Sequence, residues 1–429
     1  MTQNSAGQAV SVTPDSTYSS LPAVLTPGGN GNLATSISYA TSWAVTSVTG
    51  PNGATNTTTY DTLGRPLTST IPDGARTDYT YSYNPYNTQT AILCPDPIGS
   101  PCPTVTTIGH QWTTSTQDGF GRTTKVEKGH DSVTISTVDT VYKPCACSPL
   151  GKMSAVTLPY KPGATPVWTV YAYDGSGRTL SVKVGASDSL GNNAAGTTTY
   201  SYQGNVTTVT DPAGKWKKFT TDAMGNLALV AEPNPGGGSD FTTAYTYNAA
   251  NQLTGVNMLR NTDTQARGFG WTGSDLTTAT NPENGTVSYT YDGAHHPLTR
   301  TDAKGQQTQY SYDTYGRLAE VRHYVLVPPY NQLQEVTNQR VDYSYDTDYT
   351  GLNGSNWGRL AQVTFQPEAG GNGETLGYLY SYNQAGRVTT QRMRVYYKNW
   401  QNFGAPADLD ARYQWDTVGR MKTLTYPGM

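Results

Sequence analysis

Polar and aromatic side chains alternate with a period of two along much of the chain. In stretches such as Tyr289–Tyr291 the pattern is Tyr-x-Tyr, which places both rings on the same face of a β-strand because successive side chains point to opposite faces. Thr and Tyr, the two residue types that dominate these stretches, both favour strands. No segment shows convincing 3.6-residue periodicity, so the pattern predicts an all-β chain of short strands with almost no helix.

The predicted strands are punctuated by a four-residue turn signal, Asp-x-x-Gly, which is followed by Arg. Asp at the first position can accept hydrogen bonds from the backbone ahead of it, and Gly at the fourth can take a positive φ. We therefore interpret the signal as a hairpin built on a type I turn. Where Gly is replaced, the substitutes Asn251 and His295 are residues that tolerate the left-handed region. We assign this structural role in the turns to Asp61, Gly64, Arg65, Asp174, Gly177, Arg178, Asp313, Gly316, Arg317, Gly386, Arg387, Asp416, Gly419 and Arg420.

The turn signal recurs as part of a repeat of about twenty residues, which holds two strands and two turns. Asp292 and Asp313 mark neighbouring units 21 residues apart. Each unit also carries a second turn, as in Pro72-Asp73-Gly74. Degenerate copies run from Thr58–Leu67 to Tyr413–Lys422. Joined hairpin to hairpin, they predict one long antiparallel sheet.

The unit Tyr-x-Tyr-Asp-x-x-Gly-Arg-Leu resembles the YD repeat of the RHS family, which includes bacterial RHS proteins, the B and C components of Tc toxins, and teneurins. The resemblance covers roughly residues 55–429. It implies a YD-repeat antiparallel β-ribbon that spirals into a β-solenoid or hollow, shell-like array. Toxin-bearing members end in a core segment with paired Asp residues, and nothing similar follows Tyr413–Arg420. This departure and the low repeat count favour an open array over a sealed cocoon.

The domain prediction is a Ser/Thr/Gly-rich segment, 1–54, followed by the repeat array, 55–429, with a Cys- and Pro-containing insertion around 90–150. An open array exposes a strand edge at each end, and exposed edges template further pairing. The N-terminal segment could pair with its own array or with a neighbouring subunit by strand addition. A head-to-tail contact that does not close would give a homopolymer.

Charge and composition narrow the class of protein. The chain carries 28 basic and 31 acidic side chains, a net charge of −3, which argues against a nucleic-acid partner and a polybasic membrane anchor. No apolar run reaches the roughly 20 residues of a membrane span. Charged residues make up only 14% of the chain, and polar neutral residues replace them, as is typical of secreted bacterial surface proteins. We expect an extracellular or cell-surface location, although 1–7 shows no signal peptide.

Four cysteines, Cys94, Cys102, Cys145 and Cys147, are the candidates for disulfide bonds. Their spacings, Cys-x7-Cys and Cys-x-Cys, do not match paired zinc ligands. Disulfides are favoured over free thiols and over a metal site, with three connectivities open.

The sequence shows no nucleophile elbow, no metal-binding His pair and no phosphate-binding Gly loop. His295 and His296 occupy the Gly-Arg positions of their repeat, so they are interpreted as turn substitutions. The Asp residues are explained by their turn positions, and the repeat Arg residues by local pairing with Asp or stacking on Tyr. We therefore expect no enzymatic activity, no cofactor and no metal.

The function that this sequence favours is a non-enzymatic extracellular scaffold, either a shell or a self-assembling surface filament. One alternative is a fragment of an RHS shell that encloses a toxin. Another is an adhesin or glycan-binding module, since exposed Trp and Tyr rings suit pyranoses; hits on a glycan array would favour it.

Overall fold

The computed structural model describes residues 2–3, 9–83, 87–94, 110–330, 332–348, 352, 354–365, 375–396 and 407–427. Within these ranges the chain forms 34 strands and two single-turn 3₁₀ helices, η1 (Gly31–Leu33) and η2 (Thr337–Gln339). The prediction of an all-β chain with almost no helix is confirmed. The strands are β1 Thr2–Gln3, β2 Ala9–Pro14, β3 Pro22–Pro27, β4 Thr35–Tyr39, β5 Val45–Thr49, β6 Thr55–Tyr60, β7 Pro66–Thr70, β8 Arg76–Ser82, β9 Asn87–Cys94, β10 Gln111–Gln117, β11 Thr123–His130, β12 Val133–Cys145, β13 Ser148–Thr157, β14 Trp168–Tyr173, β15 Thr179–Ala186, β16 Gly196–Gln203, β17 Val206–Thr210, β18 Trp216–Thr221, β19 Leu227–Glu232, β20 Phe241–Tyr247, β21 Leu253–Arg260, β22 Asp263–Thr272, β23 Asp275–Asn281, β24 Gly285–Tyr291, β25 Pro297–Thr301, β26 Gln307–Tyr312, β27 Leu318–Val327, β28 Gln332–Glu335, β29 Val341–Tyr345, β30 Leu360–Phe365, β31 Thr375–Tyr382, β32 Val388–Tyr396, β33 Ala407–Trp415 and β34 Met421–Thr425.

The described strands make one antiparallel ribbon in which strands that are consecutive in the sequence pair with each other, except β28 and β29. β12 carries the ladder through a corner, because its first half pairs with β11 up to Asp139 and its second half pairs with β13 from Thr140. β27 is the one strand that pairs with two later strands, β28 near its end and β29 near its start, among the residues described. The segment before residue 55 continues the same ribbon, since β5 pairs with β6. The predicted boundary at 54/55 stays a prediction.

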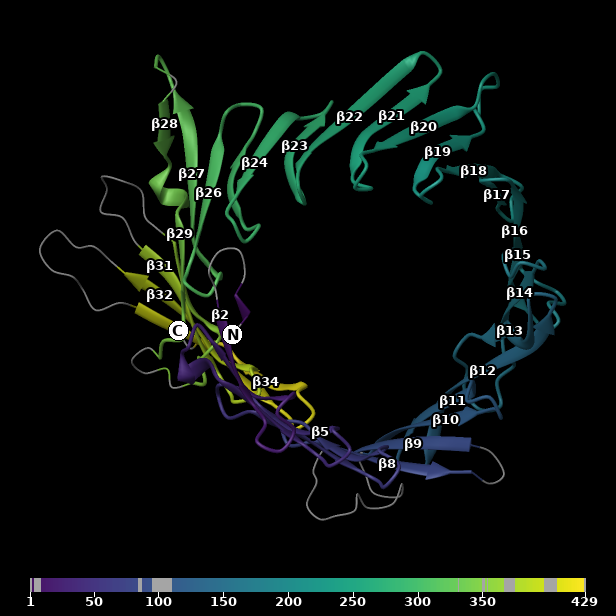
Figure 1. Cartoon of the computed structure of the whole chain (residues 1–429), viewed down its shortest axis with the longest axis horizontal. Helices are drawn as coiled ribbons and strands as arrows, with labels where there is room; N and C mark the ends of the chain where they lie inside the picture. The colour runs from purple at the N-terminus through teal and green to yellow at the C-terminus, as the bar shows by residue number, and fades with distance from the viewer. Residues whose placement is uncertain are drawn as a thin grey trace, which may run out of the picture.

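The ribbon curls into a ring with an open centre, and its two ends overlap (Figure 1). The yellow C-terminal strands lie beside the purple N-terminal strands, so the chain completes a little more than one winding. We call the edge that carries the turns at Asp61, Asp174 and Asp313 the YD rim, and the edge that carries the second turns, such as 72–74 and 211–214, the opposite rim. Where the ends overlap, the opposite rim of the first winding meets the YD rim of the second. We call this contact the seam.

The seam is held by turn-to-turn hydrogen bonds between residues about 300 positions apart. The Asn30 side chain donates to the Tyr315 hydroxyl at 3.0 Å. Asn52 bonds both backbone groups of Trp357, donating to its carbonyl at 2.8 Å and accepting from its amide at 3.1 Å. Close approach is possible here because the turns have glycines: a Cβ on Gly28 would lie 2.8 Å from the Tyr315 ring.

One seam contact is an ion pair between windings. The turn at 383–387 has Asn383 where other turns have Asp, so Arg387 lacks a carboxylate of its own. Asp73, from the opposite rim of the first winding, supplies it: its carboxylate accepts from Arg387 Nε at 3.3 Å and from Asn383 Nδ2 at 3.2 Å. The Asp73 side chain is only 5% exposed.

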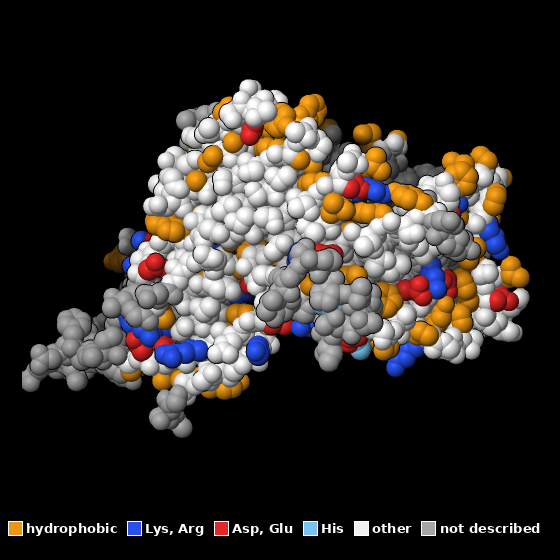
Figure 2. Space-filling view, turned by 90° about the horizontal axis from the view of Figure 1, so that it is seen from below, with side chains coloured by type: hydrophobic (Ala, Val, Ile, Leu, Met, Phe, Trp, Pro, Cys, Tyr) orange, Lys and Arg blue, Asp and Glu red, His pale blue; other side chains and the backbone are white. Residues whose placement is uncertain are grey.

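Most of the ribbon is a single layer, and its deeply buried side chains concentrate in the overlapping parts of the chain. There the structure buries Leu33, Leu352 and Leu379, whereas in the rest of the described ribbon the buried apolar residues are mostly alanines. Seen from below, the wall is largely white, with small groups in which blue and red side chains adjoin (Figure 2). A one-layer wall cannot build a thick core, so contacts at the rims must supply part of its stability.

We predict that Asp73→Ala destabilises the overlap of the windings. The change leaves the Arg387 guanidinium without its nearest carboxylate, and a lost buried, charge-assisted hydrogen bond costs about 1–3 kcal/mol. Urea unfolding should show this loss, and amide hydrogen exchange should quicken around 383–387.

The control is Glu283→Ala, which removes an acid from an uncovered opposite-rim turn. Glu283 is exposed and pairs with Arg267, so its loss should cost less than about 1 kcal/mol. Equal losses for the two variants would contradict the role given to Asp73.

Candidate functional site

The YD rim holds the signature residues of the repeat, and the turn at Asp61 shows their arrangement. The Asp61 carboxylate accepts from the Leu63 and Arg65 backbone amides through Oδ1, both at 2.9 Å. Its Oδ2 accepts from Arg65 Nε at 2.7 Å. The Gly64 amide donates to the Asp61 carbonyl at 3.0 Å, closing the turn. Asp118, Asp174, Asp313 and Asp416 repeat this arrangement with Arg122, Arg178, Arg317 and Arg420.

The fourth turn position requires a positive φ. Gly64, Gly177, Gly316, Gly386 and Gly419 have φ between 76° and 90°. The non-glycine substitutes Asn251 and His295 have φ of 60° and 67°, as predicted. Each turn also shifts the register of the strand pairing by one residue, as between Thr59 and Tyr60, so the turn is a type I turn with a bulge.

The side chain after the glycine ties its turn to the next hairpin. The Arg65 guanidinium lies 4.3 Å from the centre of the Tyr81 ring, and Arg178 lies 4.3 Å from that of Tyr202. The residue at this position can also reach the next YD turn. Lys152, which follows Gly151, donates from Nζ to the Gly177 carbonyl at 2.7 Å. Cation–π contacts of this kind contribute about 0.5–2 kcal/mol each.

An aromatic residue before most YD turns forms the second tie. The Tyr81 hydroxyl donates to the Pro66 carbonyl at 2.9 Å, and Tyr202 donates to Thr179 at 2.8 Å. The acceptor is always the residue that follows the Arg position of the preceding turn. We call this bond the tyrosine staple. It recurs at Tyr60, Tyr173, Tyr247, Tyr291, Tyr312, Tyr345 and Tyr382, and indole N–H groups make it at Trp271 and Trp415.

The comparisons with known proteins agree with this geometry. Residues 272–307 and 291–324 match the family model described as RHS Repeat, and they contain the turns at Asp292 and Asp313. Residues 272–324 of this chain are RHS repeats. No curated protein matches its sequence.

Solved structures share the fold of this RHS-repeat chain. The crystal structures of TcdB2-TccC3-Cdc42, of TcdB2-TccC3 without the hypervariable C-terminal region and of TcdB2-TccC3-TEV align with TM-scores of 0.55, 0.55 and 0.56. Each is 12% identical and covers 97% of this chain. The chain spans about a third of their length, 31%, 30% and 31%. At this identity the likeness shows the fold: a long antiparallel sheet resembling the Tc toxin RHS shell.

Two YD turns depart from the common arrangement. At 383–387, Arg387 pairs with Asp73 across the seam, as described above. The second is the turn formed by Asp346, Gly358 and Arg359, where Asp346 pairs with Arg317 of the preceding turn through two bonds of 3.0 and 2.6 Å. Arg359 instead donates to the Asn383 and Gln384 carbonyls of the next turn. The repeat spacing could not have revealed either partner exchange.

The YD turn around 145–152 is an RHS unit that the sequence pattern hid. Gly151-Lys152-Met153 takes the place of Gly-Arg-Leu, and Lys152 lies 4.3 Å from the Tyr173 ring centre. The hairpin extends beyond this position, with Cys145 paired opposite Ser148, and Cys145 and Cys147 are joined by a disulfide at its tip. Cys94 is fully buried and is also in a disulfide, while Cys102 lies outside the described residues.

Both histidines of the 295–296 pair contact aspartates of YD turns. His296 replaces the turn Arg: its Nδ1 lies 3.0 Å from Asp292, and its ring stacks on Tyr312. His295 Nδ1 lies 2.9 Å from Asp275 in the preceding turn. Among the residues described, no cluster of three or more His, Cys, Asp or Glu could hold a metal, and no helix is long and apolar enough to cross a membrane.

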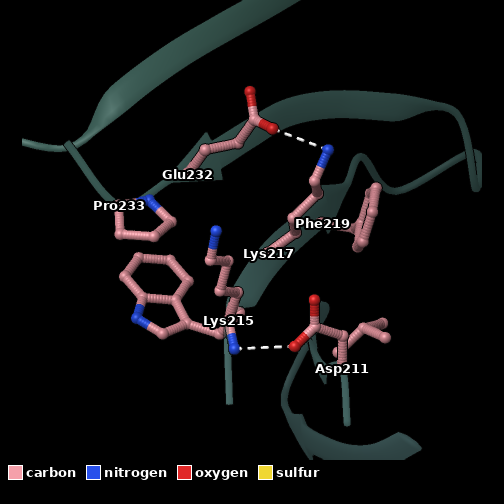
Figure 3. Close-up of a pocket in the computed structure, with 8 residues that line it drawn as sticks. Asp211, Lys215, Lys217, Phe219, Glu232 and Pro233 are labelled. Atoms are coloured by element: carbon pink, nitrogen blue, oxygen red, sulfur yellow. Dashed lines mark hydrogen bonds and ion pairs between the residues drawn. The ribbon is translucent and has the colours of Figure 1, made fainter. Parts of the chain in front are cut away.

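A groove of about 400 Å³ lies on the opposite rim between the turns at 211 and 233. Its walls carry Phe219 and Pro233, and a Lys217–Glu232 ion pair of 2.6 Å spans one side (Figure 3). Trp216 also lines it, but Lys218 Nζ lies 4.3 Å from that ring's centre. A sugar platform needs an open aromatic face, so this Trp supports glycan binding poorly. Glycan binding stays a prediction.

The rim shifts the pKa of its ionisable groups in opposite directions. The Arg65 side chain and backbone amide lower the pKa of Asp61, and the Arg122 side chain does the same for Asp118. Burial raises the pKa of the staple hydroxyls of Tyr81, Tyr202 and Tyr345.

We predict that stability falls at both ends of the pH scale. The Asp carboxylates have lowered folded pKa values, so their contribution is present above about pH 4 and is lost as the pH falls through those values. The tyrosines have raised folded pKa values, so theirs is present below about pH 10 and is lost as the pH rises through those values. Urea midpoints against pH should show a plateau between, and tyrosinate absorbance should appear together with alkaline unfolding. Ordinary tyrosine titration in the intact fold would contradict this.

We predict that Tyr202→Phe lowers the free energy of unfolding by about 1 kcal/mol, the net contribution of one hydrogen bond. The ring stays, so stacking with Arg178 is kept and only the staple is lost. Tyr200→Phe is the matched control: it lies two residues away on the same face, and its hydroxyl makes no hydrogen bond within the described part of the chain. Urea denaturation should separate the two variants; equal effects would rule out the staple as the cause.

Proposed function

We propose that the chain is a non-enzymatic structural scaffold, a section of a curved shell wall. The observation that carries the proposal is that the repeat residues are engaged with one another. In the turns at Asp61, Asp174 and Asp313, Asp binds the backbone and Arg, Arg stacks on the next tyrosine ring, and that tyrosine's hydroxyl bonds the preceding turn. Side chains that make these contacts maintain the shape of the ribbon and are not free to bind a substrate.

The carboxylates of the turns illustrate why we infer no catalysis there. Both oxygens of Asp61 accept charge-assisted or backbone hydrogen bonds. These bonds lower its pKa, which makes it a poor general base near neutral pH. The same holds for Asp118 and Asp174, whose pKa values are lowered by bonds from Arg122 and from Arg178.

We further propose an extracellular or cell-surface location. The low charged fraction and the disulfide between Cys145 and Cys147 support it, because disulfides persist in oxidising compartments. Mass measurement with and without reductant checks this bond in the purified protein.

Enclosure of a toxin is the second candidate, and the similar fold supports it. The solved relatives are TcdB2-TccC3 proteins, and one of their titles names a hypervariable C-terminal region. The chain would then form part of a larger shell that assembles with other toxin components. A gene that continues into a variable C-terminal domain would favour this function over a free-standing scaffold.

The scaffold proposal predicts that the purified chain is a curved, hollow particle in solution. Electron microscopy should show rings with an open centre, and small-angle X-ray scattering should give the pair-distance distribution of a hollow body. Asp73→Ala should shift part of the population to opened ribbons, because it weakens the seam, whereas Glu283→Ala should leave the rings closed. Compact solid particles, or straight ribbons in the unaltered protein, would refute the proposal.

A further inference from the structure

The residue that precedes the glycine of a YD turn has two environments in this molecule. At the seam this residue is Tyr315, Trp357, Ala385 or Val418, and each is half-buried. The reason is that opposite-rim turns of the first winding cover the YD turns there. Asn30 bonds the Tyr315 hydroxyl, and Gly28 lies against its ring. The seam thus shows what an opposite-rim turn does when it meets a YD turn.

Along the first winding the same position is apolar at several turns and has no cover. Leu63 is 73% exposed, Phe120 66%, Leu150 59% and Met224 71%. At other first-winding turns the residue is small, as at Ser176 and Ala250. One exposed apolar side chain is ordinary, but a recurrence at one structural position along one rim indicates a contact surface.

The opposite rim along 160–240 is uncovered as well. A Cβ on Gly163, Gly214 or Gly237 would meet no atom within 4 Å, in contrast to Gly28 at the seam. These glycines belong to Pro- and Gly-containing turns, Lys161-Pro162-Gly163, Asp211-Pro212-Ala213-Gly214 and 233–238. They share this chemistry with the seam turns Pro51-Asn52-Gly53 and Pro72-Asp73-Gly74. One molecule therefore carries both halves of the seam contact in uncovered form.

We propose that the exposed YD rim of the first winding binds the opposite rim of a second copy of this chain. The contact repeats the seam between molecules: Pro- and Gly-containing turns of one copy cover Leu63, Phe120, Leu150 and Met224 of the next. The partner is a second copy because the seam already shows that these two rims of this chain fit each other. The inference rests on the proposed scaffold function and identifies the binding partner of the scaffold as a second copy of the chain.

The geometry makes the contact heterologous, because one rim binds a different rim. A heterologous contact that does not close produces an open series, so copies stack rim on rim and extend the wall. Within one chain the seam has a high effective concentration, whereas separate copies must also offset the entropy of association. Assembly therefore depends on protein concentration, and because the covered side chains are apolar it depends little on salt.

Sedimentation velocity on the full chain from about 1 µM to about 1 mM tests the inference, a span that covers weak association. The unaltered protein should form a ladder of species that grows with concentration, and electron microscopy at high concentration should show stacked rings. The variant Leu63→Ser, Phe120→Ser, Met224→Ser should need roughly tenfold or more protein for the same average mass, since three apolar contacts are lost.

Two further variants keep the test decisive. The control Leu180→Ser, Val184→Ser, Leu259→Ser removes equally simple apolar groups that are exposed on strands, and it should assemble as the unaltered protein does. Ala213→Glu places a charge on an uncovered opposite-rim turn and should also weaken assembly, which probes the other half of the contact if the triple rim variant folds poorly.

A protein that stays monomeric at every concentration overturns the inference, as does a closed dimer that grows no further. So does a rim variant that assembles like the control. Hollow monomeric rings without assembly would leave the scaffold function standing while this inference fails. Monomers that are not rings would contradict both the scaffold function and this inference.

Discussion

The fold depends on the carboxylate at the first position of the regular YD turns. By accepting two backbone amides and the guanidinium four residues on, it fixes the turn and also fixes the direction of the Arg side chain. An Arg held in this way loses little further conformational entropy when it stacks on the next tyrosine. The local turn and the contact between neighbouring hairpins are therefore one cooperative unit, and substitution of its Asp would disturb both.

This arrangement solves a problem that a single-layer sheet has in general. A sheet usually gains stability by burying one face against a second layer, but most of this ribbon has none, and few of its described side chains are fully buried. Tyrosine suits such a wall better than phenylalanine, because its ring can cover the sheet while its hydroxyl reaches a backbone carbonyl. The sequence has 32 Tyr and 6 Phe, and the recurring staple gives that imbalance a structural reason.

The local level of this fold could be predicted from sequence, because the interactions that decide it are local. Asp61, Gly64 and Arg65 lie within one turn, and Tyr79 and Tyr81 within one strand, so their spacing carries the information. The seam could not be predicted, since Asp73 and Arg387 are 314 residues apart and neither motif contains a signal that identifies the other as its partner. One signal was present: Asn383 breaks the Asp rule, which leaves Arg387 without a local carboxylate. An exception in a repeat can therefore mark the place where a distant segment completes it.

The seam also shows what sets the register between windings. The bonded pairs Asn30–Tyr315, Asn52–Trp357 and Asn383–Asp73 are separated by 285, 305 and 310 residues. The separations differ, yet successive opposite-rim turns meet successive YD turns. The register is therefore counted in hairpins and not in residues. A longer hairpin, such as the one that carries the Cys145–Cys147 disulfide, leaves the count unchanged, because it lengthens β12 and β13 without adding a strand. A lost or gained hairpin would instead bring Asp73 to a different turn and leave Arg387 without a carboxylate. The Asn at position 383 therefore favours the register in which Asp73 meets Arg387.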